Sequence, residues 1–233
     1  MVTINMPILE KKIALITGAK GGLGGFVTAA FLEAGATVIG VSRSIQASDF
    51  PHPRFTAMPA ELSSGDAAHH LVHKVGRIDI LVHLVGGFAG GTPVHETDDA
   101  TLDQMLDENL KSTFHIVRAV LPRMRQQGSG RILAIGSRAA VEPSPGAGAY
   151  AVSKAALVSL IRTIASENKD RSITANVILP GTMDTPKNRQ AMPQADFSKW
   201  VQPSQVANLL VTLASDAASE VSGTAIPIYG AEL

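Results

Sequence analysis

Tyr150 and Lys154 have the residue types and the spacing needed to move a proton together. They stand four residues apart in a segment whose apolar residues recur at helical spacing, so both side chains lie on one face of the predicted helix. A tyrosine hydroxyl can protonate a carbonyl oxygen, although its ordinary pKa of about 10 is too high for easy exchange near neutrality. The positive charge of Lys154 favours the phenolate, and we therefore expect it to lower the pKa of Tyr150. Ser137 precedes Tyr150 by thirteen residues and can donate a hydrogen bond to the same carbonyl oxygen.

A glycine-rich turn lies between a predicted strand and a predicted helix. Residues 17–24 read Thr-Gly-Ala-Lys-Gly-Gly-Leu-Gly and follow an apolar run. Gly18 lets the chain turn sharply, Gly22 lets the backbone approach a pyrophosphate, and Gly24 lets the helix pack closely on the sheet. The free N–H groups at the helix start would face the anion. This context predicts dinucleotide binding, whereas the G-x-x-x-G-x-G spacing alone would also suit an ordinary tight turn.

Apolar runs that predict buried strands alternate with helical patterns along the chain. The predicted strands are Ile13 to Thr17, Thr37 to Val41, Phe55 to Met58, Ile78 to Val85, Arg131 to Ile135, Thr174 to Leu179 and Ala225 to Ile228. Helices are expected at residues 22–34, 65–75, 98–126 with a break, 148–168 and 203–215. The repeated βαβ pattern predicts a doubly wound α/β fold with a mainly parallel seven-stranded sheet and helices on both faces. The long stretch 181–203 is expected to be irregular and to cover a ligand.

The composition of the 233-residue chain narrows the classes of function. Hydrophobic residues make up 45%, enough for one substantial core, and the length is in the single-domain range. The 20 basic and 20 acidic residues balance without a long run of one sign, which argues against nucleic acid or an anionic membrane as a partner. There is no cysteine, so disulfides and thiol catalysis are excluded. The charged N-terminus and the lack of an apolar run of about 20 residues argue against a signal peptide and a membrane span, and favour the cytoplasm.

Five motifs in this order resemble the short-chain dehydrogenase/reductase family over nearly the whole chain. They are the glycine turn, Asn109 within Asn-Leu-Lys-Ser-Thr-Phe, Ser137, the Tyr150 and Lys154 pair, and Pro180-Gly181. Taken singly, Ser137 and Asn109 would also suit a strand-end cap and a polar helix residue, and a Tyr-x-x-x-Lys pair is common on helices. The combination is specific.

The resemblance implies a single-domain Rossmann fold over 1–233, a nicotinamide cofactor, and a catalytic set of Asn109, Ser137, Tyr150 and Lys154. It also implies that Asn109 bends its helix to hold a water that relays protons to Lys154, which in addition binds the nicotinamide ribose. The family is usually oligomeric, so a homodimer or homotetramer is expected, with helices 98–126 and 148–168 supplying the contacts.

The end of the second predicted strand favours NADPH over NADH, although NADH stays possible. Ser42 stands where an acid would bind the ribose of NADH, and Arg43 can pair with the 2′-phosphate of NADPH. Lys20 could add a second positive charge there or be an exposed loop residue, and Glu61-Leu62 matches a pair that holds the adenine in relatives. The expected cofactor-binding residues are Gly18, Lys20, Gly22, Leu23, Gly24, Ser42, Arg43, Glu61, Leu62, Val85, Gly86, Gly87, Tyr150, Lys154, Pro180, Gly181 and Met183.

One stretch departs from the family pattern. Many members carry Asn-Asn-Ala-Gly after the fourth strand, whereas residues 83–86 read His-Leu-Val-Gly, so the hydrogen bonds behind the last glycine must differ. We expect His83 to be a packed strand residue. His69, His70 and His73 lie on a predicted helix, but no further ligand cluster is near, and no metal site is expected.

The 86–91 segment and the 181–203 loop resemble the dihydropteridine reductase branch of the family. That branch generally lacks the serine and prefers NADH, so the retained Ser137 keeps a ketone substrate open. Apolar loop residues could form a lid over the substrate or pack as the loop's own core. The expected substrate-contacting residues are Phe88, Ser137, Tyr150, Met192, Phe197 and Trp200.

The sequence therefore predicts an NADPH-dependent oxidoreductase that reduces a small carbonyl substrate with Tyr150 as proton donor. Two alternatives within the family are reduction of a quinonoid pterin and reduction of a 3-oxoacyl thioester on acyl carrier protein. An alternative of another class is a regulator that senses NADPH without turnover. The intact Ser137, Tyr150 and Lys154 argue against the sensor, because a sensor needs no proton donor.

Overall fold

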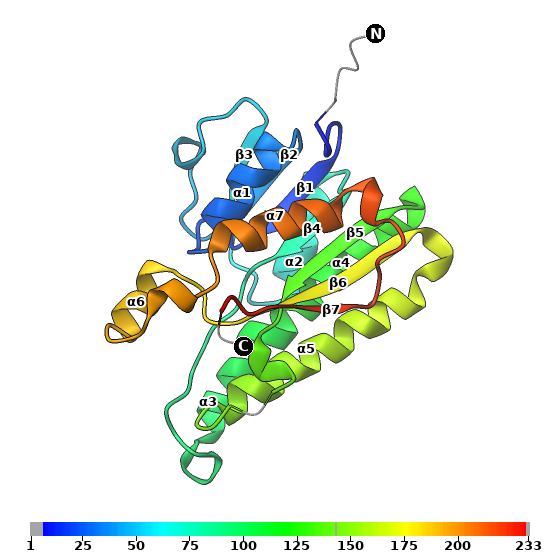
Figure 1. Cartoon of the computed structure of the whole chain (residues 1–233). Helices are drawn as coiled ribbons and strands as arrows, with labels where there is room; N and C mark the ends of the chain where they lie inside the picture. Colours follow the sequence, from blue (N-terminus) through cyan, green and yellow to red (C-terminus); the bar gives the residue numbers. More distant parts are fainter. Residues whose placement is uncertain (1–6, 143, 232–233) are drawn as a thin grey trace.

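The strands form one parallel sheet at the centre of the molecule. The computed structural model describes residues 7–142 and 144–231. Within them seven strands are hydrogen-bonded in the order β3-β2-β1-β4-β5-β6-β7, and each neighbouring pair is parallel. The strands are β1 (Ile13–Thr17), β2 (Thr37–Ser42), β3 (Phe55–Pro59), β4 (Ile80–His83), β5 (Gly130–Ile135), β6 (Ile173–Pro180) and β7 (Ala225–Ile228) (Figure 1). The predicted doubly wound α/β fold is thereby confirmed.

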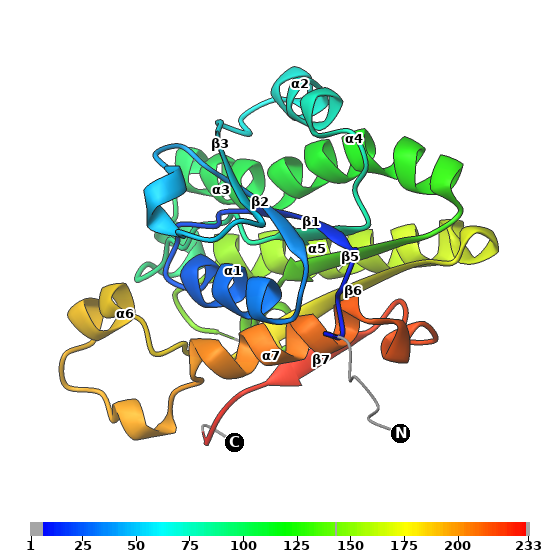
Figure 2. The same ribbon diagram turned by 90° about the horizontal axis from the view of Figure 1, so that it is seen from above.

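Helices cover both faces of this sheet and enclose two apolar cores. The covering helices are α1 (Gly24–Glu33) and α7 (Pro203–Ala214) on one face, and α2 (Gly65–Val75), α4 (Ser112–Gln127) and α5 (Gly148–Glu167) on the other. Figure 2 shows α1 and α7 together on one side of the sheet and α2 with α4 on the opposite side. Along β1, Ala14 and Ile16 belong to the core under α1 and α7, whereas Leu15 belongs to the core under α2, α4 and α5. This alternation arises because successive side chains of a strand point to opposite faces of the sheet. A strand covered on both faces must therefore be apolar throughout, as the sequence of β1 is.

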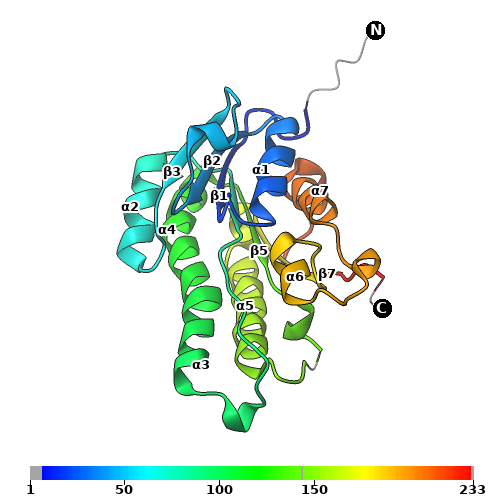
Figure 3. The same ribbon diagram turned by 90° about the vertical axis from the view of Figure 1, so that its left-hand side faces the viewer.

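The long helix predicted at 98–126 is broken where the sequence indicated. α3 (Asp99–Leu106) is followed by one π-helical turn (Asp107–Lys111) and then by α4. The Asp98 side chain caps the start of α3 by accepting a hydrogen bond from the Thr101 N–H at 2.8 Å. The three pieces continue one another as a single long rod, which extends beyond the sheet (Figure 3). The break therefore changes the helical register without changing the overall direction of the rod.

The 181–203 segment is more ordered than the expected irregular loop. It contains α6 (Pro186–Ala191) and a 3₁₀ turn (Phe197–Lys199), and it stands out from the body of the molecule (Figure 1). Thr185 caps α6 and Pro186 occupies its first turn, where a missing N–H costs nothing. The prediction called the whole stretch irregular and did not use Thr185 and Pro186 as a helix-start signal. It also made β4 too long at both ends, since the observed strand spans Ile80–His83.

Among the described residues, α5 is long and apolar enough to cross a membrane by length and composition. However, α5 packs against β6 and α3, and Lys154 on it is buried. These are properties of a core helix that lies against a sheet.

Candidate active site

The segments that were expected to bind a ligand meet at the carboxyl edge of the sheet. The four central strands β1, β4, β5 and β6 lie side by side. They lead respectively into the glycine turn, the 84–91 segment, Ser137 and the 181–203 loop. Strands β2 and β3 extend from β1 to one side, while β5, β6 and β7 extend from β4 to the other. In open α/β sheets, ligands bind outside the strand ends where the winding direction changes in this way.

The glycine turn is close-packed against itself and against the end of β4. Gly18 has φ +75°, and a Cβ there would lie 3.1 to 3.2 Å from atoms of Leu84 and Val85. A Cβ at Gly24 would overlap the carbonyl oxygen of Gly18. The nearest atoms to that Cβ thus belong to the turn itself. Both positions require glycine for steric reasons.

The start of α1 is suited to an anion. Leu23 stands at its N-cap position, and no side chain caps the helix there. Uncapped N–H groups at a helix start carry partial positive charge and bind phosphate groups. A Cβ on Gly22 would lie 3.3 Å from the methyl carbon of Thr185, so the 181–203 loop borders the turn. The sequence reasoning did not select Thr185, although a threonine before Pro186 is a helix-capping signal.

The residues expected at the adenosine end of a cofactor differ in exposure and in ion pairing. Ser42 ends β2, and Arg43 is exposed with no ion-pair partner among the described residues. Lys20 is not a free cation, since its Nζ lies 2.9 Å from Asp49 Oδ1. Glu61 is exposed, whereas Leu62 is buried in the core beneath α2 and α4.

Asn109 lies in the π-helical turn and holds the segment after β4. It is fully buried. Its Oδ1 accepts a hydrogen bond from the Gly87 N–H at 3.0 Å, and its Nδ2 donates to the Gly87 carbonyl at 3.1 Å and to Ser153 Oγ at 3.0 Å. A Cβ on Gly86 would lie 2.6 Å from Asn109 Oδ1 and 3.3 Å from Lys154 Nζ. Gly86, Asn109 and Lys154 are therefore neighbours, as the sequence motifs required.

Tyr150 and Lys154 occupy consecutive turns of α5. The Lys154 Nζ lies 5.9 Å from the centre of the Tyr150 ring and donates a hydrogen bond to the Ile135 carbonyl at 2.8 Å. Ser137 follows β5, and its Oγ accepts from the Ala139 N–H at 3.2 Å. The exposed ring of Phe88 meets the Tyr150 ring edge-on, with centroids 5.0 Å apart. The structure thus brings the phenol, the ammonium group and one expected substrate residue together.

The pKa of Tyr150 is not lowered as expected. Burial raises it, and a side-chain hydrogen bond with Ser137 acts more weakly in the opposite direction. Lys154 contributes nothing resolved to this shift. Its own charge is disfavoured, since burial lowers the pKa of Lys154 to about 8, and its Nζ hydrogen-bonds the strand rather than the phenol. The phenol therefore keeps its proton near neutral pH.

His83 is a packed strand residue, as expected. It is buried, its Nδ1 lies 2.7 Å from Thr17 Oγ1, and its Nε2 lies 3.3 Å from Ser112 Oγ. Burial, and secondarily the charge of Lys154, lowers the pKa of His83 to about 3. The ring is therefore neutral. Ser112 Oγ donates to the Glu108 carbonyl at 2.5 Å, so this network connects β1 and β4 with the π-helical turn.

The apolar residues of the 181–203 loop divide into two groups. The Phe197 and Trp200 rings lie 4.7 Å apart, Trp200 is buried, and the Arg189 guanidinium lies 4.7 Å from the Phe197 ring centre. These residues form a core of the loop itself. Met192, in contrast, is exposed.

Backbone pairing fixes both ends of this loop to the body. Met183 pairs with Val201 in an isolated bridge. The Gly181 N–H, directly after Pro180, donates to the Ile228 carbonyl at 2.9 Å. Between these ends, Asp184 receives hydrogen bonds from Arg189 at 2.5 and 2.8 Å and from Gln202 at 3.2 Å.

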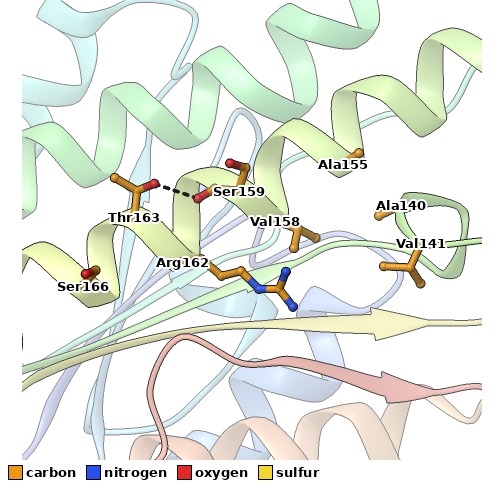
Figure 4. Close-up of a pocket in the computed structure, with 8 residues that line it drawn as sticks. All are labelled: Ala140, Val141, Ala155, Val158, Ser159, Arg162, Thr163 and Ser166. Atoms are coloured by element: carbon orange, nitrogen blue, oxygen red, sulfur yellow. Dashed lines mark hydrogen bonds between the residues drawn. The ribbon is translucent and has the colours of Figure 1, made fainter.

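A hollow of about 450 Å³ lies elsewhere, on the outer face of α5 (Figure 4). Figure 4 shows Arg162 and Ser159 from α5 on one side and Val141 from the loop after β5 on the other. None of the expected site residues lines this hollow. Within residues 7–142 and 144–231, no group of three or more His, Asp or Glu side chains could hold a metal ion.

The chain matches known proteins over nearly its whole length. The family model of the short chain dehydrogenases matches residues 12–196. The 3-oxoacyl-[acyl-carrier-protein] reductase FabG of Thermotoga maritima is 30% identical over 241 residues, which cover 95% of this chain and 98% of that protein. The 7alpha-hydroxysteroid dehydrogenase of Escherichia coli K12 is 31% identical over 242 residues, covering 95% and 94%.

A solved structure matches equally well. The Pseudomonas aeruginosa RhlG/NADP active-site complex superposes with a TM-score of 0.87 and 30% identity, covering 96% of this chain and 98% of that one. The fold, the order of the site segments and these similarities agree. The chain therefore belongs to the short-chain dehydrogenase family of oxidoreductases, which act on CH–OH and C=O groups.

Proposed function

We propose that the protein reduces a carbonyl group of a small substrate with NADPH, and that Tyr150 donates the proton. The observation that carries this proposal is the convergence of Tyr150, Ser137, Lys154 and Asn109 at the sheet edge that also bears the glycine turn. A nucleotide-binding protein that does no chemistry would need only the turn.

The residues present fit a nicotinamide cofactor. The uncapped start of α1 would hold the pyrophosphate, and Arg43 would hold the 2′-phosphate. A side chain at Gly86 would crowd Asn109 and Lys154, and its absence leaves space beside them. Lys154 would bind the nicotinamide ribose in this space. When bound, the cofactor supplies a hydride to the carbonyl carbon.

The chain's own residues would handle the carbonyl oxygen and its proton. Ser137 would donate a hydrogen bond to the oxygen and orient it, and the Tyr150 hydroxyl would give it the proton. Because burial raises the pKa of Tyr150, the hydroxyl is protonated at neutral pH, as an acid in a reduction must be. The Lys154 ammonium would then stabilise the phenolate that is left, and Asn109 would support the return of the proton.

Two narrower substrate classes have specific support. The FabG relatives are 3-oxoacyl-[acyl-carrier-protein] reductases by name, which favours a 3-oxoacyl thioester. The sequence of the 181–203 loop favours a quinonoid pterin, and the exposed Phe88 and Met192 offer an apolar surface to either substrate.

The test is a cofactor titration followed by a substrate panel. Purified protein would be titrated with NADPH and NADH by fluorescence, and the tighter cofactor used with a 3-oxoacyl thioester, a quinonoid dihydropterin and simple diketones. Turnover of the thioester alone would assign the acyl class, and turnover of the pterin would make the loop the specificity element. Tighter binding of NADH would refute the use of Arg43.

The variant Tyr150→Phe isolates the proton donor. It should lower kcat by about 10² or more while the dissociation constant of NADPH stays within about threefold, because the ring remains and only the hydroxyl is lost. Unchanged turnover in this variant would remove Tyr150 from the mechanism, and wild-type protein that binds NADPH but turns over no substrate would favour a sensor.

We further propose a homo-oligomer that uses the outer faces of α4 and α5. Phe114 on α4 and Val152 on α5 are about half exposed, at 46% and 55%, and burying such side chains in a partner would stabilise an assembly.

The cytoplasmic location and the boundaries of the single domain at 1–233 stay predictions.

A further inference from the structure

The ion pair between Lys20 and Asp49 joins the glycine turn to the segment after β2. The Lys20 Nζ lies 2.9 Å from Asp49 Oδ1 and donates a hydrogen bond to the Ser44 carbonyl at 3.2 Å. Ser44 is the next residue after Arg43. The ammonium group of Lys20 is therefore held beside the end of β2, which is where a 2′-phosphate would bind.

Asp49 is fixed in this position by its own backbone contacts. Its Oδ2 accepts a hydrogen bond at 2.8 Å from the N–H of Gln46, the N-cap residue of the 3₁₀ turn Ala47–Asp49. The side chain of Asp49 is 23% exposed, whereas that of Lys20 is 40% exposed. The Gln46 hydrogen bond and the Lys20 contact both lower the pKa of Asp49. A charged carboxylate therefore stays beside Lys20 at neutral pH.

This arrangement leaves one uncompensated cation at the adenosine end. Arg43 is exposed and has no ion-pair partner among the described residues, while the charge of Lys20 is balanced by Asp49. A dianionic phosphate placed near both groups would gain from Arg43 but would also meet the negative charge of Asp49. A ribose hydroxyl is neutral and would meet no such repulsion.

We propose that Asp49 is a specificity-determining residue that limits the preference for NADPH over NADH by neutralising Lys20. The proposal rests on the proposed function, since it requires a nicotinamide cofactor at this edge. It gives Lys20 a role that depends on Asp49, rather than that of an independent phosphate ligand.

Asp49→Asn is the decisive variant. Asparagine removes the charge but keeps a side-chain oxygen that can accept from the Gln46 N–H. Dissociation constants of NADPH and NADH would be measured by fluorescence titration. We expect Asp49→Asn to tighten NADPH by about three- to fivefold, the size of an exposed ion pair, with NADH changed by less than about twofold.

Three controls make the result specific. Asp216→Asn removes an exposed carboxylate that pairs with Lys12 at the opposite edge of the sheet, and should change neither dissociation constant. Lys20→Met should weaken NADPH, because it leaves the carboxylate of Asp49 unbalanced, and adding Asp49→Asn to Lys20→Met should bring the dissociation constant of NADPH back close to its wild-type value. Melting temperatures of all variants would verify that the fold is retained.

The outcomes separate this inference from the proposed function. An unchanged ratio of the two dissociation constants in Asp49→Asn, or no recovery of NADPH affinity when Asp49→Asn is added to Lys20→Met, would overturn the role of Asp49 alone. An Arg43→Ala variant that keeps its affinity for NADPH would refute the use of Arg43 and leave Asp49 standing. Failure to bind either cofactor would overturn both.

Discussion

Replacing Lys154 by methionine should abolish turnover and at the same time stabilise the fold. Lys154 is 5% exposed, and burial lowers its pKa from 10.5 to about 8. At about 1.4 kcal/mol per pKa unit, keeping this lysine charged costs the native state about 3 kcal/mol at pH 7. Methionine has a similar length and no charge, but it loses the hydrogen bond to the Ile135 carbonyl, which costs about 1 kcal/mol. The net expectation is a gain of about 2 kcal/mol in the free energy of unfolding.

The pH dependence of this gain tests its cause. Below pH 8 both the native and the unfolded state carry the proton of Lys154, so the full cost is present. Between pH 8 and 10.5 the native state releases the proton first, the unfolded state binds more protons, and the wild type gains stability as pH rises. The advantage of Lys154→Met should therefore shrink by about 3 kcal/mol across that interval and reverse near its upper end.

Urea unfolding, followed by far-ultraviolet circular dichroism, measures the difference in unfolding free energy between Lys154→Met and the wild type. The measurements use one protein concentration and several pH values from about 7 to 10. Lys169→Met supplies the control, because Lys169 is exposed. Its replacement should change the free energy of unfolding only slightly, and by the same amount at every pH from about 7 to 10. If Lys154→Met were less stable than the wild type at pH 7, with a difference independent of pH, burial would not be the source of the lowered pKa.

Two further substitutions probe the hydrogen bonds behind the site. Gly86→Ala would place a Cβ 2.6 Å from Asn109 Oδ1. Because this Cβ would displace Asn109 and Lys154, the variant should lose about 1 to 3 kcal/mol of unfolding free energy and its kcat should fall by about tenfold or more. Normal kinetics in a folded variant would contradict this expectation. His83→Leu would leave the hydroxyls of Thr17 and Ser112 without their ring partner. It should cost about 2 to 4 kcal/mol in urea unfolding, and a loss below about 0.5 kcal/mol would show that the network contributes little.

The strands and most helices follow from local pattern, because a sheet covered on both faces demands apolar runs. Ala14, Leu15 and Ile16 had to be apolar whichever face they point to. The break in the long helix could also be located, since Asn109 was assigned to it from the motif. Its π-helical form could not, because the extra residue is accommodated by hydrogen bonds to Gly87 and Ser153, which are distant in sequence.

The parts of the site that sequence reasoning missed depend on tertiary neighbours. Lys20 was expected either near a phosphate or as an exposed loop residue, and nothing in the sequence linked it to Asp49, 29 residues away. The pKa of Tyr150 was expected to fall because helical spacing places Lys154 nearby. Spacing does not reveal how far each group is buried, and burial is the larger effect on both.

At one of the positions where many family members carry an asparagine, this chain has a histidine that bonds to two other elements. His83 stands at the first of these positions and bridges Thr17 and Ser112 with its two ring nitrogens. Because Ser112 Oγ donates its proton to the Glu108 carbonyl, His83 Nε2 must be the donor to Ser112, and Thr17 must then donate to Nδ1. This assignment requires a neutral ring, which agrees with the lowered pKa of His83.

Gly87, directly after this stretch, contacts both Glu108 and Asn109. A Cβ there would overlap the Glu108 carboxylate, so that carboxylate occupies the volume of the missing side chain, and Gln104 Nε2 holds it by a hydrogen bond of 3.0 Å. The backbone N–H and C=O of Gly87 are at the same time both bonded to the Asn109 amide. A larger residue at 87 would therefore require the Glu108 carboxylate to move. The backbone of the segment after β4 thus holds the Asn109 amide through both of its polar atoms.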